Sequence, residues 1–176
     1  MTGSPTRSYG GAAARGGDRM PRIRTLLALG VLAAGVLGCD SAERDDTGEI
    51  VSAGSVSAFA IRVGDCFNAP TGDEFASLDA VPCDETHDAQ VYTAFDYPAE
   101  DDDGFPGIDA FETYAADPCL ADFERFVGIA FEDSRYDVRT MYPTDLSWQK
   151  GDREILCFLV DLRLRPLVGT AQGSAQ

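Results

Sequence analysis

The sequence is poor in histidine and in positive charge: it contains one histidine, His87, and 14 basic residues against 30 acidic ones. Five arginines and one aspartate precede Cys39, so the chain after Cys39 holds 9 basic and 29 acidic residues, a net charge of −20. Nucleic-acid partners require lysine and arginine to neutralise phosphates, and adhesion to anionic lipid requires the same charge. The composition therefore argues against nucleic acid as a partner and against membrane attachment by charge.

The sequence also lacks an apolar run long enough to cross a bilayer. The run at residues 26–38 has 13 residues, whereas a spanning helix needs about 20. Its length, with Arg22 and Arg24 before it, is typical of a secretory signal. It ends in VLGC at 36–39, which is similar to a bacterial lipobox. We expect Cys39 to be lipidated and to hold the protein on the outer face of the cytoplasmic membrane; the alternatives are an ordinary signal peptide with a stray cysteine and an uncleaved anchor.

Composition divides the chain into parts of different character. The Gly/Ala/Arg-rich opening is either a disordered lead or a mis-assigned start, because Met20 opens a signal peptide of ordinary proportions. The 137 residues past Cys39 suit one domain rather than two. The expected parts are a lead at 1–19, a lipoprotein signal peptide at 20–38, a lipid-anchored acidic linker at 39–57, a domain at 58–165 and a disordered tail at 166–176.

The use of cysteine agrees with export. An even number of cysteines in an exported domain predicts disulfides, and with Cys39 taken by lipid no thiol is left over. Four cysteines allow two disulfides with three possible connectivities. The four are Cys66, Cys83, Cys119 and Cys157.

His87 lies in VPCDETHDAQVY, residues 81–92, four residues after Cys83. Zinc needs four ligands, commonly in paired short spacings, and no second pair lies nearby. A cysteine nucleophile needs a free thiol, and the G-x-S-x-G elbow of a serine hydrolase is absent from the sequence. We therefore expect no catalytic residue, no metal and no cofactor, but an exposed polar turn stapled by a disulfide. The candidate interaction surface consists of Asp84, Glu85, His87 and Trp148.

The hydrophobic pattern predicts an α+β domain. Apolar and β-branched residues predict strands at 58–63, 77–83, 88–95, 136–144 and 153–164. Helical spacing predicts a helix from Ile108, and Asp117-Pro118 has the N-cap and N1 chemistry that restarts a helix, which Gly128 ends. The last strand is apolar on both faces, which favours a position inside the sheet. We expect a small antiparallel sheet of about five strands packed against one or two helices.

Several segments in their order resemble the septum-formation domain family. The resemblance covers about residues 58–161, and Gln90 stands where the family typically has a glutamate. Members are exported or membrane-anchored domains of actinobacteria, so the resemblance implies export, the disulfide pattern and a role in division-septum formation, without a reaction or a ligand. The segments are VGDCFN (63–68), VPCDETHDAQVY (81–92), CLADFERFVG (119–128) and YPTDLSWQKGDREILCFL (142–159), together with the lipobox.

We predict that Cys66 pairs with Cys83 and that Cys119 pairs with Cys157. The first pair would join neighbouring strand ends across a loop, and the second would join the inward face of the helix to the last strand. Crossed pairings would require a cysteine of the early strands to reach the helix, from which the acidic segment 99–106 separates them. Hairpin-like neighbours readily bring Cα atoms within the roughly 7 Å that a disulfide needs.

Three functions are compatible with these features. We favour a non-enzymatic, lipid-anchored extracytoplasmic interaction module that serves envelope or septum assembly through an unknown envelope or septal protein, and an exposed aromatic patch with Trp148 would support it. A small-ligand or cation-binding lipoprotein predicts a carboxylate cluster with a vacant centre. An extracytoplasmic hydrolase that uses His87 with a carboxylate predicts a cleft converging on the imidazole.

Overall fold

The computed structural model describes residues 41–70, 76–99 and 104–176. The expected lead, the signal peptide and the lipidation site at Cys39 lie outside the described residues and stay predictions. Within the described ranges, no helix has both the length and the apolar character needed to cross a membrane.

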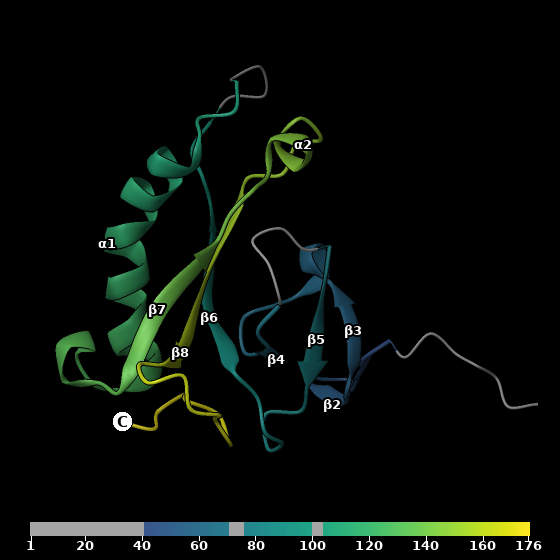
Figure 1. The fold of residues 1–176 in the computed structure, drawn as a ribbon, viewed down its shortest axis with the longest axis vertical. Coiled ribbons are helices and arrows are strands. Elements are labelled where there is room, and N and C mark those ends of the chain that lie inside the picture. The colour runs from purple at the N-terminus through teal and green to yellow at the C-terminus, as the bar shows by residue number, and fades with distance from the viewer. Residues whose placement is uncertain (1–40, 71–75, 100–103) are drawn as a thin grey trace, which may run out of the picture. The chain divides into compact units, whose positions relative to one another are not determined.

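The described residues form an α+β fold with two antiparallel sheets (Figure 1). The fold class is confirmed, and the larger sheet has six strands where about five were expected. In sheet order its strands are β3 (Gly54–Ser57), β5 (Ser77–Val81), β4 (Cys66–Asn68), β6 (Ala89–Asp96), β8 (Glu154–Asp161) and β7 (Tyr136–Met141). The smaller sheet pairs β1 (Glu43–Arg44) with β2 (Ile50–Ser52).

Strand β8 lies between β6 and β7, as its two apolar faces predict. Ile155, Cys157 and Leu159 on one face belong to a first core, and Leu156 and Val160 on the other belong to a second. Figure 1 shows α1 on one side of β6, β7 and β8, with β3, β4 and β5 on the other side. Both faces of β8 are therefore covered, which explains its nearly continuous apolar sequence.

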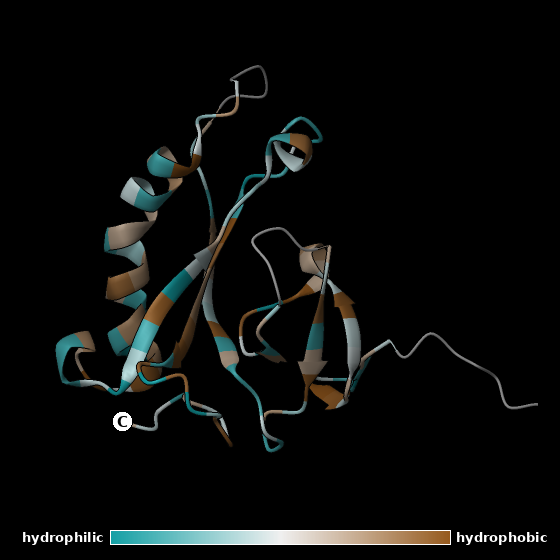
Figure 2. Ribbon diagram, viewed as in Figure 1, coloured by the Kyte–Doolittle hydropathy of each residue, from teal (hydrophilic) through white to brown (hydrophobic). Residues whose placement is uncertain are grey.

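Helix α1 (Ile108–Val127) covers the first core as one continuous helix. The predicted restart at Asp117-Pro118 is wrong, since the helix runs through Pro118. Proline removes one helical hydrogen bond, but the apolar stripe continues on both sides of it and keeps the helix on the sheet. Figure 2 shows α1 alternating between hydrophobic and hydrophilic positions. The buried positions recur every four residues: Phe111, Ala115, Cys119, Phe123 and Val127.

The two disulfides have the predicted pairing. Cys66 and Cys83 are joined with their Cα atoms 5.2 Å apart, and Cys119 and Cys157 with theirs 5.9 Å apart. The sequence separations are 17 and 38 residues. Loop-closure entropy for such separations corresponds to about 3 and about 4 kcal/mol of stability. One bridge fastens the predicted turn to β4, and the other fastens α1 to β8.

The strand expected at 58–63 is absent. Residues Ala58–Ala60 form a short 3-10 helix, η1, and the Ser57 hydroxyl caps it by accepting a hydrogen bond from the Phe59 N–H at 3.3 Å. This cap explains why a helical turn replaces the expected strand. A serine whose side chain accepts a hydrogen bond from the N–H two residues later favours a helical turn over an extended strand. The Phe59 side chain consequently points into solvent and is 68% exposed.

Most of the segment expected to be a linker at 39–57 folds with the domain. From Glu43 onward it forms β1, β2 and β3, and Ile50 and Val56 are buried in the second core. Arg44 fastens it through two hydrogen bonds of 2.6 Å to the Asp65 carboxylate. The prediction of a linker is therefore wrong for these residues. Two buried apolar side chains and one paired arginine are enough to pack this polar segment against the domain.

The segment expected to be a disordered tail, 166–176, packs against the domain, and we call it the strap. Leu167 and Ala171 are buried, and Leu167 exchanges backbone hydrogen bonds of 2.7 and 3.1 Å with His87. Gly173 and Ala175 donate to the last carbonyls of α1, which lack partners within the helix. The low hydrophobicity of this segment predicted disorder, but the segment is held mainly by backbone hydrogen bonds, which its side chains do not reveal.

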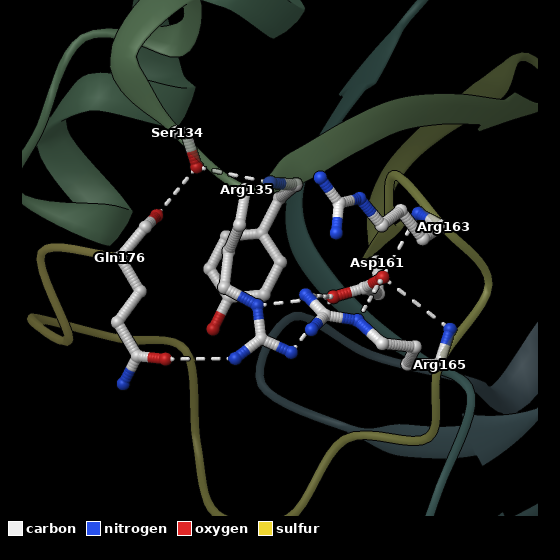
Figure 3. A network of polar contacts seen from close by, with 7 residues as sticks. Ser134, Arg135, Asp161, Arg163, Arg165 and Gln176 are labelled. Carbon is white, nitrogen blue, oxygen red and sulfur yellow. Dashed lines mark hydrogen bonds and ion pairs between the residues drawn. The ribbon is translucent and has the colours of Figure 1, made fainter.

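A buried carboxylate joins the end of β8 to the residues that precede β7 (Figure 3). The Asp161 side chain is fully buried, and Arg135 and Arg165 reach its Oδ2 at 2.7 and 2.8 Å. Hydrogen bonds from Arg165, and then from Arg135 and two backbone N–H groups, hold the pKa of the Asp161 carboxyl well below its usual range although burial opposes them. Arg135 also donates to the Gln176 side chain, so the network reaches the strap.

Candidate functional site

The predicted polar turn carries two of the four residues of the expected interaction surface into solvent. Asp84 and Glu85 are exposed, and the Glu85 N–H donates to the Pro82 carbonyl at 3.0 Å, which closes the turn. The disulfide to Cys66 holds its beginning. These two carboxylates are therefore available to a partner.

His87 is fully buried, which overturns its expected place on an exposed turn. Its Nδ1 lies 2.9 Å from the Glu85 carbonyl oxygen, and because a carbonyl can only accept, Nδ1 carries the proton. Its Nε2 is buried without a hydrogen-bond partner among the described residues. The strap, through Leu167, pairs with the His87 backbone. A substrate therefore cannot reach the imidazole while the strap is in place.

Trp148 is also buried, at 3% exposure, and so does not form the expected exposed patch. It ends α2 (Asp145–Trp148), which begins with a capping box of Thr144 and Ser147. The indole packs in the first core beside Phe111, and the Arg153 guanidinium lies 3.7 Å from the ring centroid. The cation covers the ring face that would otherwise meet water, so sequence alone overestimated its exposure.

A polar cleft of about 800 Å³ borders the predicted turn. Its wall includes Asp84 and Glu85, together with Glu49 and the guanidinium-bearing Arg62. Across the described residues, no group of three or more histidine, cysteine, aspartate or glutamate side chains is arranged to hold a metal ion. The cleft thus has mixed charge and does not form the carboxylate cluster that cation binding predicts.

Gln90 lies beneath this cleft and holds the strap. Its Nε2 donates to the Gly64 carbonyl at 3.0 Å and to the Thr170 hydroxyl at 2.9 Å. Its Oε1 accepts from the Ala171 N–H at 2.7 Å. The amide thus uses both a donor and an acceptor, and its polar groups are engaged within the protein.

A second hollow, which we call the η1 groove, lies where η1 approaches β7 and β8. It has a volume of about 410 Å³. Phe59 stands at its rim in solvent, and Ile108 at the start of α1 is 54% exposed. Large exposed apolar side chains around a hollow are typical of binding surfaces. The lining residues that matter here are Phe59, Ile108, Met141, Asp152, Glu154 and Leu156.

Two carboxylates, those of Asp152 and Glu154, line one wall of the η1 groove, and Asp96 adjoins that wall. Glu154 lies directly opposite Asp96 in the register of β6 and β8, and the Asp152 carboxylate accepts from the Glu154 N–H at 3.2 Å. Partial desolvation raises the pKa of the Glu154 carboxyl, and the neighbouring carboxylates of Asp152 and Asp96 raise it further. The ion pairs found among the described residues all lie elsewhere.

Sequence reasoning missed the residues of the η1 groove. Phe59 and Glu154 lay inside expected strands, and Asp96 lay just outside one; none of the three was expected to line a binding surface. A usable signal was Ser57, two residues before Phe59, because a serine there favours a capped turn over a strand. The pairing of Asp96 with Glu154 depends on strand register, which the sequence of either strand leaves open.

The family model described as "Septum formation" matches residues 63–175. The match includes both disulfides and the strap as far as residue 175. A comparison with curated proteins and one with solved structures each find no match.

Proposed function

The chain belongs to the septum-formation family, and we propose that it is a lipid-anchored, non-enzymatic module that binds an envelope or septal protein outside the cytoplasm. The family points to a role in cell division or the cell envelope. The lipobox ending at Cys39 supports the anchor, and the strongly acidic domain supports a protein partner over nucleic acid.

One observation carries the binding function: the η1 groove has a solvent-exposed phenylalanine at its rim. Phe59 is 68% exposed and borders a hollow of about 410 Å³. Aromatic side chains are enriched in the centres of protein interfaces, and they supply many of the residues on which affinity depends. The exposed part of the Phe59 ring contributes no packing energy to the isolated domain. A partner that covers the ring would explain why an aromatic side chain lies at this exposed position.

The surroundings of the nucleophile and base candidates support binding over hydrolysis. The cysteines of the described residues are joined in disulfides, so they offer no thiolate. His87 is fully buried beneath the strap. A general base must come within hydrogen-bond reach of the proton that it removes, and this imidazole is closed off from a substrate.

Complementation of a deletion strain tests the function. Cells that lack the protein should show abnormal spacing of septa, and the full chain should restore it. Phe59→Asp should fail to restore it, because a carboxylate at the rim prevents an apolar contact. The control is Leu162→Asp, which places the same charge on another exposed apolar site, 63% exposed and outside the groove. Full complementation by Phe59→Asp, with both variants equally abundant in membranes, would contradict the function.

The anchor has its own test, Cys39→Ala. The variant should leave the membrane fraction or accumulate unprocessed, because the lipid is expected on this sulfur. Unchanged membrane association together with an unchanged mass of the mature protein would show that Cys39 is not lipidated.

A further inference from the structure

The η1 groove has an apolar wall and an acidic wall, and this combination identifies the kind of segment that fits it. Resting on the binding function above, we propose that the groove takes up a segment of the partner protein that presents a lysine or arginine beside an apolar side chain. The cation lies against Asp152 and Glu154 in the groove lining and near Asp96, which is the register partner of Glu154, and the apolar side chain lies against Phe59.

The apolar wall is suited to a side chain of variable shape. Leu156 is buried at its base, and Met141 lies beside it in the register of β7 and β8. Methionine is flexible and polarisable, and it adapts to different partners. The volume of about 410 Å³ lies in the range of about 300–1,000 Å³ that is usual for ligand pockets. A partner side chain can therefore be enclosed between this wall and Phe59.

The acidic wall is unfavourable in the free protein. Asp96 and Glu154 face each other across β6 and β8, and like charges at directly opposite positions destabilise a sheet. Asp152 adds a third carboxylate next to Glu154. A lysine or arginine from a partner relieves the repulsion and replaces it with attraction, so the cluster favours the bound state.

The same features distinguish a protein segment from other cationic or apolar ligands. A free metal ion would leave Phe59 and Met141 in contact with water, and the carboxylates among the described residues are not arranged to hold one. A purely apolar segment would cover Phe59 but leave three carboxylates at the edge of a desolvated surface, which costs free energy. An anionic lipid surface would be repelled by the domain, whose chain after Cys39 has a net charge of −20. A segment with both chemistries satisfies both walls.

Selection from a random dodecapeptide phage library on the full chain in detergent micelles tests this inference. Enriched peptides should share a lysine or arginine adjacent to a large apolar residue. Synthetic versions should bind about tenfold more weakly to Asp96→Asn/Glu154→Gln, which removes two ion-pair partners, and to Phe59→Ala. Replacing the peptide's arginine by neutral citrulline should weaken binding to the wild-type protein more than binding to the double variant, which keeps only Asp152.

The matched control is Glu132→Gln/Asp133→Asn, on the exposed η2 turn (Phe131–Asp133), which removes the same net charge outside the lining of the groove. Equal losses in both double variants would show attraction by net charge alone and overturn the inference. Enriched peptides without a basic residue, or no enriched peptide, would overturn it too. If such peptides still require Phe59, the binding function stands and only the cation requirement fails.

Discussion

At the scale of single residues, Gln90 shows how one amide orders its surroundings. It donates to the Gly64 carbonyl and accepts from the Ala171 N–H. A carboxylate there would accept from Ala171 but would face the Gly64 carbonyl without a proton to donate.

We therefore predict that Gln90→Glu lowers the free energy of unfolding by about 2 kcal/mol at pH 7, the cost of a buried group left without its hydrogen bond. The loss should shrink as the pH falls, because a protonated carboxyl can donate to Gly64 again. Urea unfolding at pH 7 and pH 5 measures it. The control Gln172→Glu adds the same charge at an exposed site and should change stability little; equal effects of the two substitutions would contradict the role of Gln90.

Asp161 makes a prediction about pH. Hydrogen bonds from Arg165 and Arg135 lower the pKa of its carboxyl in the folded state, so its contribution is complete above the ordinary pKa of about 4. It is lost as the pH falls towards the depressed folded-state pKa. Asp161→Asn should cost about 2 kcal/mol at pH 7, and the difference from wild type should shrink below about pH 4. The control is Asp46→Asn, which changes an exposed carboxylate. A difference that stays constant from pH 7 to pH 2 in urea titrations would refute this.

The buried positions of His87 and Trp148 mark the limit of sequence reasoning at this scale. A polar neighbourhood indicates exposure for His87, but the residue that pairs with its backbone is Leu167, far along the chain. Trp148 is likewise buried, because the first core and the Arg153 guanidinium cover its ring. Burial of a single side chain depends on such distant contacts, and local composition does not contain them.

At the scale of elements, the strap does the most to complete the fold. Leu167 is its buried apolar anchor, whereas its neighbour Val168 is 69% exposed. We predict that Leu167→Ala lowers the free energy of unfolding by about 2–4 kcal/mol, as expected for truncation of a buried leucine, and speeds amide exchange at His87. Val168→Ala is the matched control and should stay within about 0.5 kcal/mol of wild type. Thermal unfolding and hydrogen exchange measure both, and equal effects would mean that the strap does not hold the domain.

Elements with strong hydrophobic patterns were predictable. The two apolar faces of β8 indicated a central strand, the stripe of α1 indicated its buried face, and the cysteines on these two elements indicated the disulfide that joins them. The segment 43–57 and the strap were not predictable, because few apolar residues and many backbone hydrogen bonds hold them. At Pro118 the sequence predicted a helix start that the structure does not have, because packing along the whole helix outweighs the local signal.

At the scale of the whole molecule, the disulfides act against charge repulsion. The chain after Cys39 carries 29 acidic and 9 basic residues, and an excess of one charge destabilises a compact state. Cross-links limit how far the unfolded chain can expand to relieve that repulsion. We predict that reduction lowers the melting temperature more at low salt than at high salt, because salt screens the repulsion. Calorimetry with and without a reductant at two salt concentrations tests this; a drop that does not depend on salt would contradict it.

Photocrosslinking from the rim of the η1 groove in living cells tests the central claim most directly. A photoreactive phenylalanine analogue at position 59 should give one discrete adduct with an envelope protein. The cross-linked segment, mapped by mass spectrometry, should carry a lysine or arginine beside an apolar residue, and the adduct should disappear with Asp96→Asn/Glu154→Gln. The same analogue at position 162, another exposed apolar site, should not give this adduct. If the two positions give the same adducts, or if position 59 gives none, the η1 groove is not the binding site.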